Sequence, residues 1–307
     1  MTSYRAVLWL PVVLMACRGG DTLGRGDSSA VHTIPTPSAS PVALNPGWDD
    51  SVAGPVLILP AAESAPRVSV VLPLLTDSVL TGFSALDLDS LSGLPVDLFG
   101  PAGSVGSSVL ATAPVKRAVE GCLAWPETSL AKTPDRPWRV GFRQGAAVGL
   151  KLDSIESMPS ADSSRIAAEI ARLVSPLAEG ADSAFRGLPF SVRKAYRFSI
   201  DGTSVLVSDV VRKIAQEANP REEHILLIAE RPQSGEEKYT VAFHSRVSGS
   251  EDVVRTHEIL SAVRFVRNAR PVIVVAFGYA DGGRIALLER TGEKRWKVSW
   301  RSAYTGC

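Results

Sequence analysis

The pattern of apolar and polar residues predicts antiparallel strands over the second half of the chain. Apolar and polar side chains alternate at residues 196–200, 239–247 and 295–301. Because successive side chains of a strand point to opposite faces, this alternation predicts strands with one buried and one solvated face. The runs 225–229 and 272–277 are apolar throughout, which predicts strands at the centre of a sheet.

Hairpin turns are predicted where a short flexible pair separates two of these strands. The pairs are Asp201-Gly202, Asp281-Gly282 and Thr291-Gly292. Pairs of this kind tolerate the positive φ angles that two-residue hairpin turns require. The strands after residue 189 are therefore expected to join in chain order as an antiparallel meander.

In the last predicted strand, tryptophans and cations occupy alternating positions. Trp296 and Trp300 alternate with Arg295, Lys297 and Arg301. One interpretation is a basic face for lipid headgroups or acidic glycans. We favour the other, in which both tryptophans fill the core on one face while the cations deter pairing at a sheet edge.

Shorter strands are predicted between about residue 55 and residue 155, separated by glycine and proline. This spacing of strands and turns is typical of an all-β module. The candidate strands are 56–59, 67–72, 96–99, 108–112, 122–125, 138–143 and 148–152.

One segment has helical periodicity. Ile166, Ile170 and Leu173 recur at intervals of three and four residues, which predicts a helix near 161–175 with one apolar face. Ser160 is expected to cap its first turn. With the strands, this helix predicts a mainly β fold built as an antiparallel meander, a sandwich or a degenerate propeller, with an α+β fold as the alternative.

The N-terminus carries a short apolar run that ends in Leu14-Met15-Ala16-Cys17. Residues 6–16 contain no charge and follow Arg5, and they are too few to span a bilayer, which takes about 20 helical residues. This segment resembles the signal peptide and lipobox of bacterial lipoproteins. The resemblance implies cleavage before Cys17 and acylation of Cys17, so membrane lipid is the expected partner, and Arg18 rather than Asp favours the outer membrane.

The chain is then expected to have five parts. A signal peptide (1–16) precedes a lipid-anchored disordered tether (17–50), which is rich in Gly, Ser and Pro and lacks apolar periodicity. A β-rich N-terminal region (51–155), a helical connector (156–188) and an antiparallel β C-terminal region (189–307) follow.

Composition narrows the range of possible functions. Lys and Arg total 33 against 32 Asp and Glu, and this formal net charge of only +1 does not steer the chain to nucleic acid. A hydrophobic content of 45% suffices for a core. With Cys17 assigned to lipid, Cys122 and Cys307 remain as a pair. In an oxidising envelope such a pair is expected to form a disulfide, with two separate buried thiols as the alternative.

Residues 259–300 are similar to an FG-GAP-type propeller blade, a family whose blades bind calcium through an Asp-rich loop. The similarity rests on consecutive hairpins and a tryptophan near the end. The similarity fails at the positions where the Asp ligands for calcium would lie, because residues 267–270 read Arg-Asn-Ala-Arg. Calcium is therefore not expected there, and the alternative is a generic meander or sandwich.

No catalytic residue, metal ligand or cofactor motif is predicted. His257-Glu258 begins like a zincin helix, but Ser261 stands where the second histidine is required. The leading hypothesis is a non-enzymatic binding or structural role in the envelope, with the protein or glycan partner undefined. The alternative is a hydrolase with a dispersed site, which we would favour if two of His224, His244 and His257 met an acidic residue in one cleft.

Overall fold

The computed structural model describes residues 47–61, 66–75, 87–116, 122–178, 182–215, 219–234, 238–250, 253–279 and 282–306. These residues belong to one compact unit, Val42–Cys307. The signal peptide, Cys17, most of the tether and Cys307 lie outside the described residues. Three antiparallel sheets account for the fold, which confirms the predicted mainly β class.

The N-terminal sheet is built from six short strands of the first half of the chain. Its outermost strands are β4 and β5, and every described pairing within it is antiparallel. In spatial order the strands are β4 (Gly103–Val109), β3 (Pro95–Gly100), β6 (Val140–Arg143), β1 (Leu57–Pro60), β2 (Arg67–Val71) and β5 (Glu127–Ser129).

The central sheet joins the C-terminal meander to one strand from the first half of the chain. In spatial order its strands are β16 (Arg295–Arg301), β15 (Gly282–Gly292), β14 (Pro271–Tyr279), β13 (Thr256–Phe265) and β7 (Ala147–Leu150). The short β17 (Thr305–Gly306) also pairs with β15.

The helix-side sheet has long strands and is covered by the main helix. In spatial order its strands are β12 (Thr240–Ser250), β11 (Arg221–Pro232), β10 (Thr203–Ile214), β9 (Ser191–Ile200) and β8 (Asp153–Ser154). The helices are α1 (Asp50–Ala53) and α2 (Ser160–Val174), with 3-10 turns η2 (Asp89–Leu91), η3 (Ile155–Ser157), η4 (Pro176–Ala178) and η5 (Ser183–Phe185).

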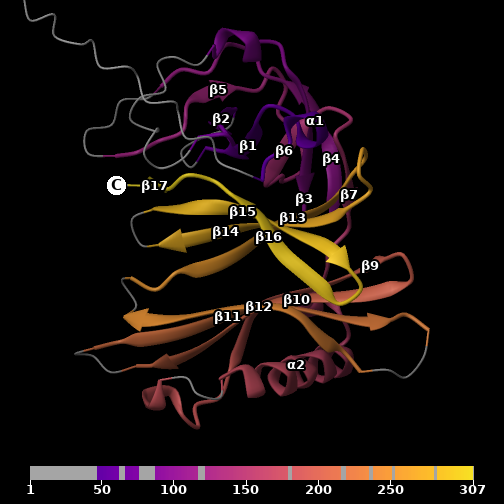
Figure 1. Ribbon diagram of the computed structural model, residues 1–307, viewed down its shortest axis with the longest axis vertical. Helices are drawn as coiled ribbons and strands as arrows, with labels where there is room; N and C mark the ends of the chain where they lie inside the picture. The colour runs from indigo at the N-terminus through magenta and orange to yellow at the C-terminus, as the bar shows by residue number, and fades with distance from the viewer. Residues whose placement is uncertain are drawn as a thin grey trace, which may run out of the picture. The chain divides into compact units, whose positions relative to one another are not determined.

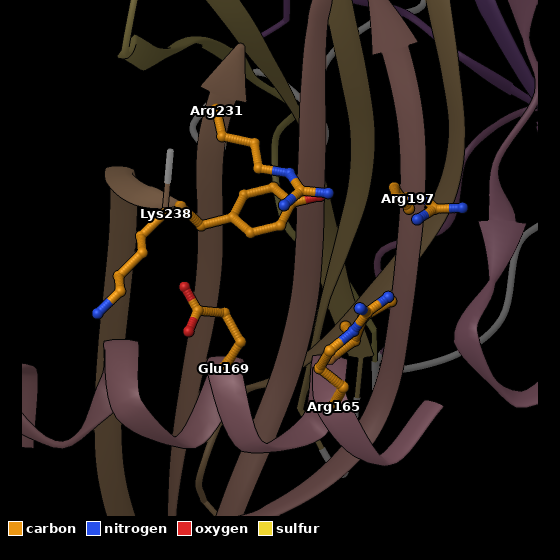
Figure 2. Close-up of a pocket in the computed structure, with 7 residues that line it drawn as sticks. Arg165, Glu169, Arg197, Arg231 and Lys238 are labelled. Carbon is orange, nitrogen blue, oxygen red and sulfur yellow. The ribbon is translucent and has the colours of Figure 1, made fainter. Parts of the chain in front are cut away.

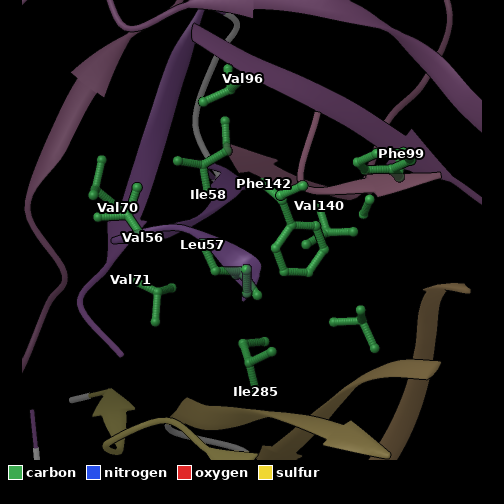
Figure 3. Packing of buried hydrophobic residues seen from close by; sticks show 14 of the residues in the cluster. Val56, Leu57, Ile58, Val70, Val71, Val96, Phe99, Val140, Phe142 and Ile285 are labelled. Atoms are coloured by element: carbon green, nitrogen blue, oxygen red, sulfur yellow. The ribbon is translucent and has the colours of Figure 1, made fainter. Parts of the chain in front are cut away.

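The central sheet is buried on both faces, so the sheets stack as layers (Figure 1). Along β14, Val272 and Val274 belong to the core shared with the N-terminal sheet, whereas Ile273 and Val275 belong to the core shared with the helix-side sheet. This two-sided burial explains why 272–277 has no polar alternation. Figure 3 shows Ile285 of the central sheet facing the cluster of the N-terminal sheet.

A third core lies between the helix-side sheet and α2. Ile166, Ile170 and Leu173 of α2 pack there on β10 and β11 residues such as Leu206 and Leu227. The helix and its apolar face were therefore predicted correctly. Its cap was not, because α2 begins at Ser160 itself and Pro159 precedes it without a side-chain cap hydrogen bond.

Two other local predictions were wrong. Residues 122–125 do not form a strand, since only Leu123 pairs there, in an isolated bridge to Gly306. The turn before β16 uses Glu293 and Lys294, because β15 extends through Gly292 and Lys294 takes the positive φ of 52°. The predicted Asp201-Gly202 turn is confirmed, with φ angles of 48° and 73°.

The two tryptophans of β16 are both buried but lie on opposite faces of the central sheet. Trp296 belongs to the core facing the helix-side sheet, and Trp300 belongs to the core facing the N-terminal sheet. The register explains the reversal: Leu288 is opposite Val298 while Leu287 is opposite Trp300, so Ser299 is an extra, bulged residue. Because a bulge inserts one extra residue, the side chains on its two sides no longer follow one alternation. The prediction that both tryptophans share a face was therefore wrong.

The FG-GAP-like stretch forms β13 to β16, a four-strand antiparallel meander inside the central sheet. Its neighbours are face-to-face sheets, so the stacked sandwich is the alternative that the fold supports. Among the described helices, none is long and apolar enough to cross a membrane.

Candidate functional site

A cavity of about 220 Å³ opens where α2 lies over the end of the helix-side sheet, and we call it the arginine pocket (Figure 2). Its walls come from the middle of α2, from two strands, and from the segment that leads into β12. The lining residues are Arg165, Ile166, Glu169, Arg197, Arg231, Lys238 and Tyr239.

Strand register brings the two arginines of the sheet to the same face. Arg197 of β9 is opposite Leu206 of β10, and Arg231 of β11 is opposite Ser204 of β10. Because neighbouring strands lie about 4.8 Å apart, the backbones of β9 and β11 are separated by roughly 10 Å. Leu206 packs in the core beneath α2, so both arginines rise from the helix-covered face.

Tyr239 forms a buried apolar and hydrogen-bonding surface in this pocket. Its hydroxyl is 2.8 Å from Oγ of Ser204, and its side chain contributes to the core beneath α2. The guanidinium carbon of Arg231 lies 4.7 Å from the centroid of the tyrosine ring. This cation–π contact holds Arg231 over the ring while leaving the guanidinium N–H groups available to a ligand.

Glu169, the one carboxylate among the described residues of the lining, is already neutralised. Glu169 accepts two hydrogen bonds from Arg172, at 2.7 and 2.8 Å. The hydrogen bond from Arg172 lowers the pKa of Glu169 against the opposing effect of burial, and the nearby charge of Lys238 acts in the same direction. Within the described residues, no ion pair engages Arg197, Arg231 or Lys238, so the pocket keeps an excess of positive charge.

The arrangement suits recognition of an anion better than covalent chemistry. Guanidinium groups match the oxygen geometry of carboxylates and phosphates, and a low-dielectric wall strengthens such contacts. Among the described residues of the lining there is no histidine, cysteine or serine that could serve as a base or nucleophile. In the part of the chain that the structure describes, no group of three or more His, Cys, Asp or Glu could hold a metal ion.

A second polar cluster lies between the helix-side sheet and the central sheet. Asp209 of β10 is 3.3 Å from Nδ1 of His257 on β13 and 3.8 Å from Nδ1 of His224 on β11. Arg193 also contacts Asp209, at 3.0 Å. The side chains of Asp209 and both histidines are at most 1% exposed.

Burial governs the protonation of this cluster. Desolvation lowers the pKa of His257 and outweighs the opposing hydrogen bond and charge of Asp209. Burial alone would raise the pKa of Asp209, but the nearby ring of His224 and the hydrogen bond from His257 outweigh it and lower that pKa. Nε2 of His257 has no hydrogen-bond partner among the described residues, which fits a neutral ring that donates from Nδ1.

The histidines that the sequence singled out are therefore only partly brought together. His224 and His257 meet Asp209, whereas His244 lies exposed on β12. The meeting point is a packed interface between sheets, so the condition of a shared cleft is not fulfilled. Asp209 was missed by sequence reasoning, although a single carboxylate inside the mostly apolar segment 205–211 signals a buried partner.

The other predicted site residues lie elsewhere. Cys122 is described and half-buried, and its neighbour Leu123 exchanges two backbone hydrogen bonds with Gly306, at 2.8 and 2.9 Å. Arg295, Lys297 and Arg301 are exposed on β16, away from the arginine pocket. The 267–270 segment forms the turn between β13 and β14.

Comparison with known proteins gives no match: no protein-family model, curated protein or solved structure corresponds to the chain.

Proposed function

We propose that this protein is a lipid-anchored lipoprotein of the bacterial cell envelope, at the outer membrane, whose folded part binds a ligand without transforming it. The anchor is Cys17, proposed from the apolar segment and lipobox that precede it. The binding role is carried by one observation: the arginine pocket is open and cationic, whereas Asp209 and its two histidines are sealed between sheets.

Acylation at Cys17 is tested by detergent phase separation of protein expressed in a bacterial host. Wild-type protein should enter the detergent phase, and its N-terminal peptide should carry acyl mass on Cys17. Cys17→Ser should lose that mass. Wild-type protein with an unmodified Cys17 would overturn the lipid anchor.

The binding role is tested by thermal unfolding of the full chain in nonionic detergent with neutral sugars, polyamines, carboxylates and phosphates. At least one class should raise the melting temperature of the wild type, and the Arg197→Gln/Arg231→Gln double variant should lose that shift. If no class acts on the wild type, or if the double variant responds equally, the pocket is not the binding site.

A hydrolase is the second candidate, because Asp209 and His257 have the proximity of a catalytic Asp–His pair. Wild type and Asp209→Asn are compared on chromogenic ester, phosphate, glycoside and peptide substrates. We expect no turnover by either protein. Turnover by the wild type that Asp209→Asn abolishes would favour the hydrolase over the binding role.

We further propose a disulfide between Cys122 and Cys307. Leu123 and Gly306 form a hydrogen-bonded antiparallel pair, and the next pair along this ladder would be Cys122 and Cys307. Hydrogen-bonded and non-hydrogen-bonded pairs alternate along an antiparallel ladder, so Cys122 and Cys307 would form a non-hydrogen-bonded pair. The Cα atoms of such a pair lie about 4.5 Å apart, within the range that a disulfide spans.

A further inference from the structure

The charge of the arginine pocket defines what it can hold. Among the residues that the structure describes, four cationic side chains line it, Arg165, Arg197, Arg231 and Lys238, against one carboxylate. Arg165 also contacts Asp162, at 2.9 Å, and Glu169 is held by Arg172, so these carboxylates are already neutralised. A neutral or cationic ligand would leave the remaining positive charges crowded together, whereas a multiply charged anion would relieve that repulsion.

The donors also converge from several sides. In Figure 2, Arg231 and Lys238 lie on one side of the pocket, Arg197 lies across from them, and Arg165 rises from α2 below. A ligand between them would meet guanidinium groups from three separate elements: α2, β9 and β11. A tetrahedral group with oxygens pointing in several directions fits such an arrangement better than a planar carboxylate, which presents its two oxygens to one side.

The size of the cavity is consistent with a small ligand. It measures about 220 Å³ and is partly open to solvent. That volume suits a phosphate group with a small substituent, and it is below the 300 to 1,000 Å³ typical of sites that enclose a drug-sized ligand.

We infer that the arginine pocket binds a phosphate group with two or more negative oxygens, supplied either by a free phosphate or phosphate monoester or by a phospholipid whose headgroup is a phosphate monoester, as in phosphatidic acid. This inference rests on the proposed function, in which the pocket is a non-catalytic binding site. Arg197 and Arg231 are the central ligands because each comes from the rigid sheet, and Tyr239 orients Arg231.

The test is calorimetric titration of the full chain in nonionic detergent with inorganic phosphate, with monomeric dihexanoyl phosphatidic acid and with acetate. Phosphate should bind with an affinity that falls as salt rises, and acetate should bind at least about 10-fold more weakly. Arg197→Gln and Arg231→Gln should each weaken phosphate binding about 10-fold or more, the usual loss for a charge-assisted hydrogen bond. Arg186→Gln, an exposed arginine outside the pocket, should stay within about twofold of the wild type.

The same titrations distinguish the two possible sources of the phosphate group. Tighter binding of dihexanoyl phosphatidic acid than of phosphate indicates a lipid headgroup, and equal or weaker binding indicates a free phosphate or ester. The inference is overturned if neither binds, or if both bind the Arg197→Gln/Arg231→Gln double variant as they bind the wild type. If the double variant instead loses a response to a sugar, polyamine or carboxylate, the pocket remains a binding site and only the phosphate assignment fails.

Discussion

The carboxylate of Glu230 on β11 accepts two hydrogen bonds from the guanidinium of Arg290 on β15, at 2.7 and 2.8 Å, and so joins the helix-side sheet to the central sheet. The same carboxylate accepts the indole N–H of Trp296 at 2.5 Å and the backbone N–H of Lys294 at 2.9 Å. Burial opposes ionisation of Glu230, but these donors outweigh it and lower its pKa. A fully buried charge is tolerated because each of its oxygens is paired.

Replacing Glu230 should therefore destabilise the protein strongly. Glu230→Ala leaves the guanidinium of Arg290 and the indole of Trp296 without their acceptor, and breaking a buried pair in this way costs about 3–5 kcal/mol. Urea unfolding measures the loss. Glu156→Ala, which removes an exposed partner of Lys194, is the control and should cost at most about 1 kcal/mol. Equal effects of the two substitutions would contradict the assigned role of Glu230.

Titration of His257 should contribute to the pH dependence of the free energy of unfolding. Burial lowers its pKa in the folded protein, so below the ordinary value of about 6.5 the unfolded chain binds a proton that the folded chain does not. Stability should therefore fall as pH drops from 7.5 to 5.5, by at most about 1.4 kcal/mol per pH unit for this one group. The lowered pKa values of Asp209 and Glu230 act below about pH 4, outside this window.

His257→Gln should flatten that dependence. The variant removes the titrating ring, so its free energy of unfolding, measured in urea at pH 7.5, 6.5 and 5.5, should change less than that of the wild type. His244→Gln removes an exposed histidine and should leave the slope of the wild type intact. A slope unchanged in His257→Gln would show that another group titrates in this window.

Periodicity predicted the elements of this fold better than it predicted which side chains share a face. The apolar spacing of Ile166, Ile170 and Leu173 identified α2 because a helix presents residues three and four apart on one side. Alternation predicted the wrong face for one of Trp296 and Trp300, because the strand has a bulge at Ser299. The bulge is set by pairing with β15, a tertiary relationship that no local pattern encodes.

The candidate site was hidden from the sequence for a similar reason. Arg165, Arg197 and the short segment that carries Arg231 and Lys238 are far apart in the chain, and each of these cations alone is indistinguishable from an ordinary surface cation. Only the register of β9, β10 and β11 together with the position of α2 collects them around Tyr239. Asp209 was more predictable, since a lone carboxylate within an apolar strand requires a buried partner.

Close contact between two sheets predicts a large effect at Gly149 of β7. A Cβ atom there would clash with the backbone N of Ser104 and would lie 2.7 Å from the backbone C of Gly103. Backbone cannot rotate away as a side chain can, so Gly149→Ala must separate β4 from β7 and should cost about 1–3 kcal/mol. Gly106→Ala on β4 meets only an ordinary contact of 3.9 Å with Pro134 and should be close to neutral. Similar melting temperatures for the two variants would contradict the close approach.

The proposed disulfide should stabilise the body of the protein by tying its C-terminal end to Leu123 and Trp125. Trp125 is buried in the core between the N-terminal and central sheets, and β17 pairs with β15 of the central sheet. A bond from Cys122 to Cys307 closes a loop of about 185 residues, for which the chain-entropy model gives a stabilisation of roughly 5 kcal/mol at most.

Alkylation of exported protein without reductant should therefore leave both thiols unlabelled, and mass spectrometry should find their peptides joined. Cys307→Ser should lower the free energy of unfolding, whereas reductant should destabilise the wild type but not that variant. Cys122→Ser should match Cys307→Ser, because each removes the same bond. Labelling of both cysteines in the unreduced wild type would refute the disulfide, and unequal losses in the two variants would show that one cysteine has a separate packing role.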